Sequence, residues 1–149
     1  MTDLDSDPGL DGNPGRAFDA DVFSRRCASR GVFQHVTGRW SALIVAALLE
    51  NGDPLRFAAI RRRVDGISDR MLSQTLGQIE REGMVVRTVH STIPPHVEYG
   101  LTALGQKIAE PLSALIGIIE SELPHVLEAQ RLFDEAEGTR ARGLHDAPS

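Results

Sequence analysis

The stretch SDRMLSQTLGQIERE, residues 68–82, separates its apolar and polar side chains onto two faces of an α-helix. At about 100° per residue, three apolar side chains fall within about 60° of one another and form a stripe that can pack inward: Leu72, Leu76 and Ile79. The opposite face is polar, with no carboxylate at its centre: Arg70, Ser73, Gln74, Gly77 and Arg81. The sequence therefore predicts an amphipathic helix that buries one side and presents hydrogen-bond donors and positive charge on the other.

The residues on either side of this helix define its ends and its neighbour. Ser68 is a favourable N-cap and Gly83 a favourable C-terminal stop. A shorter amphipathic helix is predicted over residues 56–64, and the turn residues Asp65-Gly66 separate the two. Two helices joined by a tight turn, the second with a polar outer face, form a helix-turn-helix.

A β-hairpin is predicted directly after the helix-turn-helix, over residues 84–90 and 96–101. The first segment is rich in Val and Thr, and the second alternates between apolar and other residues with a period of two. Two consecutive prolines, Pro94 and Pro95, stiffen the tip. A hairpin in this position adds a wing to the helix-turn-helix.

The rest of the chain predicts further helices. One spans residues 21–36, and a buried one spans residues 40–49, where nearly every residue is apolar. A long final helix follows Thr102, with a kink or a lost hydrogen bond expected at Pro111, and a further helix is expected from Pro124 to about residue 137. The predicted fold class is therefore mainly α with a small β-hairpin, a winged helix-turn-helix.

The chain has 149 residues, enough for one domain with its own hydrophobic core. We expect a flexible acidic arm over residues 1–22, a winged helix-turn-helix domain over residues 23–124, and a C-terminal helix with an acidic tail over residues 125–149. Although the net charge is −5, residues 23–119 hold twelve basic and eight acidic residues. This basic middle matters more for nucleic-acid binding than the charge of the whole chain.

Several classes of protein are disfavoured. The single cysteine allows no intrachain disulfide, no apolar stretch approaches the roughly 20 residues of a membrane span, and the first residues do not resemble a signal peptide. We therefore expect a cytoplasmic protein that does not enter a membrane. The chain has no phosphate-binding glycine loop or nucleophile elbow, and its five histidines are scattered without zinc-like spacing. We accordingly expect no enzyme activity, no cofactor and no metal site.

The order and spacing of several short motifs resemble the HxlR family of bacterial winged-helix transcription regulators. The resemblance runs from Cys27 to about Leu123, some two-thirds of the chain. Its pieces are TGRW at residues 37–40, LRF at 55–57, IS and MLSQTL at 67–68 and 71–76, EGMVVR at 82–87, PPHVEY at 94–99 and LTALG at 101–105. The resemblance implies a homodimer on a two-fold operator, with residues 68–82 in the major groove and residues 87–96 as the wing.

Three groups of side chains are candidates for DNA contact. The recognition-helix group reads bases or faces the groove: Ser68, Arg70, Ser73, Gln74, Gly77 and Arg81. The second group binds phosphates from the preceding helix, and we expect at most two of its members to do so: Arg61, Arg62 and Arg63. The third lies on the wing: Arg87, His90 and His96. For each group the alternative is an ordinary solvated surface.

Cys27 is a candidate redox sensor, because related regulators sense oxidants through a cysteine at this place. The neighbouring Arg25 and Arg26 would favour its thiolate, which is the reactive form. With no second thiol in the chain, a disulfide would join two copies of Cys27 or use a small thiol. The alternatives are an inert, partly buried cysteine and an effector molecule bound between the final helices and the core.

The final helix carries an apolar stripe that we expect to form the dimer interface: Leu104, Ile108, Leu112, Leu115 and Ile119. The alternative for this stripe is plain core packing. The alternative for the whole protein is a winged-helix module that binds other proteins instead of DNA. Binding that weakens steeply with salt would identify a DNA-binding protein, because phosphate contacts release counterions.

Overall fold

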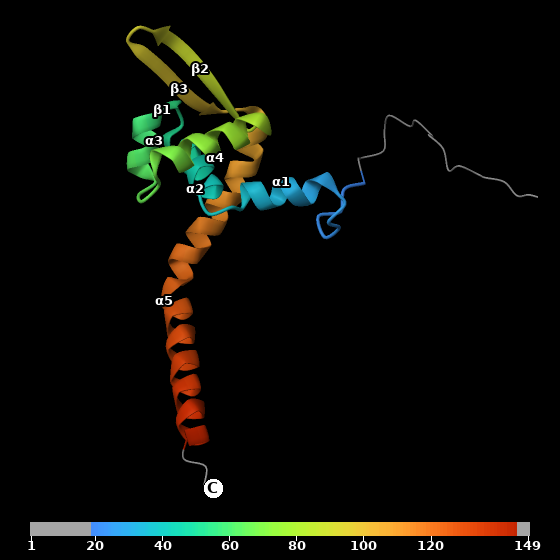
Figure 1. Ribbon diagram of the computed structural model, residues 1–149, viewed down its shortest axis with the longest axis vertical. Coiled ribbons are helices and arrows are strands. Elements are labelled where there is room, and N and C mark those ends of the chain that lie inside the picture. Colours follow the sequence, from blue (N-terminus) through green and yellow to red (C-terminus); the bar gives the residue numbers. More distant parts are fainter. Residues whose placement is uncertain (1–18, 146–149) are drawn as a thin grey trace, which may run out of the picture.

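The computed structural model describes residues 19–145 (Figure 1). The part of the predicted arm that covers residues 1–18, and residues 146–149 of the predicted tail, lie outside that range. The elements follow in the order α1 (Ala28–Val36), α2 (Ser41–Asn51), β1 (Leu55–Arg56), α3 (Phe57–Arg63), α4 (Asp69–Arg81), β2 (Val85–Thr92), β3 (Pro95–Leu101) and α5 (Ala103–His145). This arrangement confirms the predicted class, a mainly helical winged helix-turn-helix.

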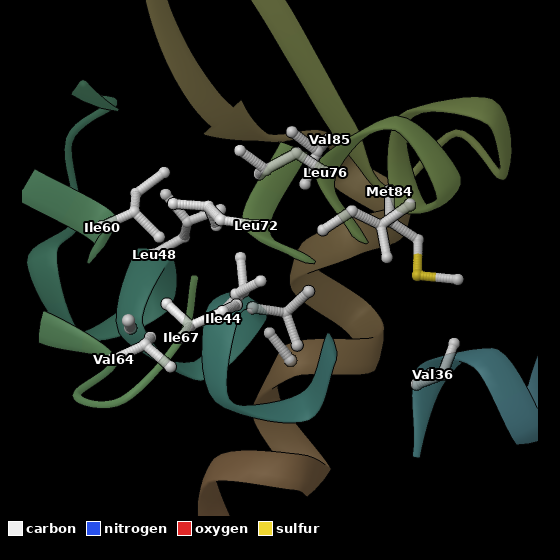
Figure 2. Close-up of a cluster of buried hydrophobic side chains, with 14 residues drawn as sticks. Val36, Ile44, Leu48, Ile60, Val64, Ile67, Leu72, Leu76, Met84 and Val85 are labelled. Carbon is white, nitrogen blue, oxygen red and sulfur yellow. The ribbon is translucent and has the colours of Figure 1, made fainter. Parts of the chain in front are cut away.

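The core lies between α2, α3, α4, the base of the sheet and the start of α5 (Figure 2). The stripe predicted for α4 is confirmed, because Leu72, Leu76 and Ile79 are at most 1% exposed. They meet Ile44 of α2 and Ile60 of α3, which are fully buried. Removing this apolar surface from water is the main force that holds the helix-turn-helix together.

The ends of α4 form as the sequence predicts. The Ser68 hydroxyl accepts a hydrogen bond from the Met71 backbone N–H at 3.1 Å, so Ser68 is the N-cap. At the other end Gly83 has a φ of 79°, and the backbone N–H of Met84 donates to the Ile79 carbonyl at 3.0 Å. This hydrogen-bond pattern closes a helix through a residue with positive φ, a conformation that favours glycine.

The sheet contains a strand that the sequence did not predict. The order is β1-β3-β2, and the two-residue strand β1 pairs Leu55 with Tyr99 and Arg56 with Glu98. So short a strand carries no alternation of its own and is defined only by its partner. The hairpin strands also extend further toward the tip than predicted, and a bulge interrupts β2 between Val89 and Ser91.

The prediction for the first helix is wrong at its start. It begins at Ala28 and not near Asp21, and turns precede it. The Asp21 carboxylate accepts from the Phe23 backbone N–H at 3.0 Å, and the Ser24 hydroxyl accepts from the Arg26 backbone N–H at 3.3 Å. Such local side-chain bonds compete with helix formation.

The prediction of two C-terminal helices, the second of which ends at about residue 137, is also wrong. α5 is one helix of 43 residues that continues through Pro111 and Pro124 to His145. The carbonyls that these prolines leave without an N–H partner belong to Lys107 and Glu120, which are exposed and can be hydrated. The distal part of α5 projects from the body at the end opposite the hairpin (Figure 1).

Candidate nucleic-acid interface

The outer face of α4 is exposed along its whole length. Figure 1 shows α4 running across the surface between α3 and the base of the hairpin. Every residue that the sequence assigns to the polar face is exposed: Arg70, Ser73, Gln74, Gly77 and Arg81. The three acidic side chains at the ends of α4 or within it lie outside the centre of this face, so the centre presents donors and positive charge to a ligand.

The three arginines of α3 differ in whether they form an ion pair. Arg61 makes an ion pair with Asp69 at 2.7 Å, and Arg63 makes one with Glu50 at 2.6 Å. Arg62 is exposed and makes no ion pair within residues 19–145. Of the three, Arg62 therefore has the charge that is most available to a phosphate.

The wing places its candidate residues in two different environments. Arg87 pairs with Tyr99 across the hairpin, and its side chain is exposed. His90 and His96 both reach Glu98, with Nε2-to-carboxylate distances of 3.1 Å and 3.0 Å. The hydrogen bond from His96, assisted by His90, lowers the pKa of the Glu98 carboxyl. Although the histidines are scattered along the sequence, the fold brings these two together, with their ring centroids 4.8 Å apart.

A polar contact that the sequence did not reveal joins α1 to the end of α4. The Glu82 carboxylate, only 9% exposed, is bonded to His35 Nδ1 at 2.5 Å and accepts from Gln78 Nε2 at 3.0 Å. His35 and Glu82 are 47 residues apart, so no local pattern could pair them. This contact joins α1 directly to the C-terminal end of α4.

A shallow cleft of about 280 Å³ lies beside α4, between it and the residues that connect α1 to α2. Its lining includes Gln74 of the predicted base-reading set. Trp40 lines this cleft and packs against the core, and the Arg39 guanidinium lies 4.6 Å from the Trp40 ring centroid. Arg39 thereby adds a positive charge beside α4 that the sequence did not single out.

Cys27 lies at the N-terminal cap of α1 and is partly exposed. The Ser29 hydroxyl donates to the Cys27 Sγ at 3.1 Å. This bond, together with one from the Ser29 backbone N–H, lowers the pKa of the thiol, because both stabilise the thiolate. The expected contribution of Arg25 and Arg26 is not among the causes of this shift, so Ser29 takes the role that the sequence assigned to them.

The lowered pKa predicts how the reactivity of Cys27 depends on pH. Since only the thiolate reacts, the rate of alkylation by iodoacetamide should rise through a midpoint below that of an ordinary cysteine. Replacing Ser29→Ala removes the hydroxyl donor and should move the midpoint to higher pH, so that the rate at pH 7 falls. The control is Ser24→Ala, which changes a nearby serine that has no bond to the thiol. Equal midpoints for the native chain and Ser29→Ala would contradict the assignment.

The residues predicted for the dimer interface divide into two groups. Ile108 and Leu112 are partly buried against the core of the same chain. Leu104, Leu115 and Ile119 are about half exposed. The exposed stripe extends further along α5 than predicted, because three more apolar residues follow on the same side of the helix: Leu123, Val126 and Phe133.

Within residues 19–145, no single helix is both long enough and apolar enough to span a membrane. Only α1 and α2 taken together, bent by 66° at the break between them, meet the criteria of length and composition. Five of the eleven residues of α2 are buried, and four of these belong to the hydrophobic core.

The fold and the exposed recognition helix define a winged helix-turn-helix protein of the kind that binds DNA and regulates transcription. The chain belongs to the HxlR-like helix-turn-helix family, whose model matches residues 35–126. It is 43% identical over 109 residues to the uncharacterized HTH-type transcriptional regulator YtfH of Escherichia coli, a match that covers 73% of this chain and 85% of the relative.

Solved structures agree with this assignment. The YtfH structure from Salmonella typhimurium superimposes with a TM-score of 0.69 at 42% identity, covering 76% of this chain and 98% of the other. The redox regulator HypR in its reduced form superimposes with a TM-score of 0.60 at 29% identity, covering 68% of this chain and 97% of the other.

Proposed function

We propose that this protein is a homodimeric, sequence-specific DNA-binding regulator in which α4 enters the major groove. The observation that carries the proposal is the exposed face of α4, which has no carboxylate at its centre while the other side of the helix is buried in the core. An α-helix fits the major groove, where each base pair presents a distinct set of donors and acceptors. Arg70 and Gln74 are the base-reading residues, with Ser73 and Gly77 facing the groove.

The remaining positive charges act on the phosphate backbone. Arg62, Arg81 and Arg87 make no ion pair with other described residues, so their charges remain available. Such contacts fix the register and raise the affinity without reading the sequence. The wing then lies along the backbone or in the minor groove, and Ser68 acts mainly by capping the recognition helix.

The apolar stripe of α5 supports the proposed homodimer. Five exposed apolar side chains fall within about 80° on a helical wheel: Leu115, Ile119, Leu123, Val126 and Phe133. A helix that projects from the body with such a face is stabilised when a second copy covers it. Two copies then carry two recognition helices to a two-fold operator.

Cys27 is the proposed trigger. HypR is described as a redox regulator, and this chain carries a thiol with a lowered pKa next to α1. Two Cys27 thiols from the two copies would form one disulfide by losing two protons and two electrons to an oxidant. The resulting movement of α1 would reach α4 through the contact between His35 and Glu82.

Because the proposed regulator acts on DNA, we place the protein in the cytoplasm.

A specific observation favours a second kind of trigger, a small-molecule effector. A cleft of about 400 Å³ lies between α2, the end of α3 and α5, in the region where the sequence analysis placed an effector. Its lining combines apolar residues with Glu50, Arg63 and Glu120. Retained regulation in a Cys27→Ser variant would favour this cleft over the thiol.

The proposal is tested by replacing the base-reading residues. Arg70→Ala or Gln74→Ala should weaken binding to a duplex selected from a random pool by ~1–3 kcal/mol, the worth of a good bidentate base contact. Binding to random duplex should change much less. Fluorescence anisotropy measures both, and Arg142→Ala is the control because it removes an exposed charge near the far end of α5. Equal losses on both duplexes would reassign the residue to phosphate binding.

Gly77 supports a sharper prediction, because stability and affinity should change in opposite directions. A Cβ at Gly77 would meet no atom within 4 Å, so Gly77→Ala should raise the free energy of unfolding by up to ~1 kcal/mol. In the complex the same methyl group would stand between α4 and the base edges and should lower the affinity. Gly31→Ala, an equally open helical position in α1, is the control. Unchanged affinity in Gly77→Ala would show that the backbone does not approach DNA there.

A further inference from the structure

Two histidines and one glutamate gather on one face of the wing. His96 and Glu98 are two residues apart on β3, so their side chains lie on the same side of the sheet. The bulge in β2 leaves His90 outside the regular pairing, and its imidazole turns toward the same carboxylate. The ligand-type atoms of the three side chains lie within 4.8 Å of one another.

These atoms are the ones that hold zinc and similar ions in proteins. Zinc binds imidazole nitrogen at about 2.0–2.1 Å and carboxylate oxygen at about 2.0–2.2 Å, which in a tetrahedral site places ligand atoms about 3.3–3.5 Å apart. The Nε2 atoms of His90 and His96 already lie 3.1 Å and 3.0 Å from the two different carboxylate oxygens of Glu98. The widest pair of ligand atoms therefore needs to close by at most about 1.5 Å.

The donor set also selects among cations. Imidazole nitrogen suits zinc and the neighbouring transition metals, whereas calcium and magnesium prefer a shell of oxygen atoms. Three protein ligands leave a coordination position open, and the cluster lies on the exposed hairpin, where such a position is accessible. We propose that His90, His96 and Glu98 form a binding site for Zn²⁺ or a similar divalent transition-metal ion on the wing.

An ion at this place changes the charge that the wing presents. With neutral imidazoles the three side chains carry the single negative charge of Glu98, which repels a phosphate. A bound divalent ion turns this into one net positive charge and offers the phosphate an open coordination position. Occupation of the site should therefore strengthen the contact between wing and backbone, an effect that rests on the DNA binding proposed above.

The site itself is tested without DNA. The tag-free full-length chain in a Cys27→Ser background is freed of metal with a chelator, dialysed and titrated with Zn²⁺ alone in a calorimeter. We expect one ion per chain, and a loss of affinity of at least about tenfold in His96→Ala or His90→Ala. The control is His125→Ala, which removes the histidine of another exposed His–Glu pair, with Glu122 at 2.6 Å on α5. Thermal unfolding in the absence of metal checks that each variant is folded.

Three results would overturn the site: no binding to the native cluster, binding that survives both wing substitutions, or an equal loss in His125→Ala. Side-chain nitrogen NMR adds a direct readout, because only the imidazole nitrogen signals of His90 and His96 should shift on addition of zinc.

The effect on DNA is measured by anisotropy with and without Zn²⁺, and we expect tighter binding by about threefold or more in low salt. Equal affinity would overturn that effect while leaving the site. Failure to bind any duplex would instead refute the proposed function.

Discussion

Replacing Gly105→Ala should lower the free energy of unfolding by ~3 kcal/mol or more, which is a large share of the ~5–15 kcal/mol that is typical of a folded domain. A Cβ at this position would lie 1.9 Å from the carbonyl oxygen of Met84, the residue before β2, so α5 and the start of β2 could not keep their present distance. Thr102 fixes this contact, because its hydroxyl donates to the Gly83 carbonyl at 2.6 Å and accepts from the Gly105 N–H at 3.0 Å. Urea denaturation at one protein concentration measures the effect.

Gly117→Ala provides the matched control on the same helix. Nothing lies within 4 Å of a Cβ built there, so this substitution should be neutral or should stabilise the helix by up to ~1 kcal/mol. We expect the changes in the free energy of unfolding for the two variants to differ in sign or by several kcal/mol. Similar stabilities for the two variants would show that α5 does not pack closely on Met84.

Replacing Ile119→Glu should reduce the affinity for a two-fold operator by about 100-fold or more. The side chain is 51% exposed in the single chain, so the fold should tolerate the charge, whereas a second copy packed on the stripe would bury it. Monomers that no longer associate bind each half-site separately, so they lose the increase in affinity that comes from binding both half-sites as one linked dimer. Sedimentation velocity measures dimer formation, and fluorescence anisotropy measures binding to the operator in the same samples.

The control for this variant adds the same charge on the other side of α5. Ser121 is exposed and lies about 200° from Ile119 around the helix, so Ser121→Glu should leave both the dimer and the DNA complex intact. A dimer that survives Ile119→Glu would place the interface elsewhere, for example on the exposed Phe23 and Phe33 near α1.

Local patterns predicted the centre of the fold well. α4 follows from the spacing of Leu72, Leu76 and Ile79, from the Ser68 cap and from Gly83, because caps and periodicity act within a few residues. The hairpin follows from its alternation for the same reason. The exposed polar face of α4, the main part of the candidate interface, is also a local property and was predicted correctly as a surface.

Features that depend on distant partners were not predictable in this way. β1 exists only through its pairing with β3, and the contact between His35 and Glu82 joins residues far apart in the sequence. The approach of His90 and His96 depends on strand register and a bulge, neither of which leaves a mark in the spacing of the histidines. The late start of α1 reflects competition from polar side chains that periodicity does not weigh.

The central claim is that two copies of α4 enter successive major grooves of one duplex. A DNA-cleaving iron chelate attached at Ser73→Cys, in a Cys27→Ser background, tests this directly, because Ser73 lies on the exposed face of α4. We predict two symmetric clusters of cleavage, separated by one turn of DNA, about 34–36 Å, or by a whole number of turns. The same chelate at Ser121→Cys on α5 should give weak, unpatterned cleavage. Equal patterns from both positions, or a single cluster from Ser73→Cys, would contradict the claim.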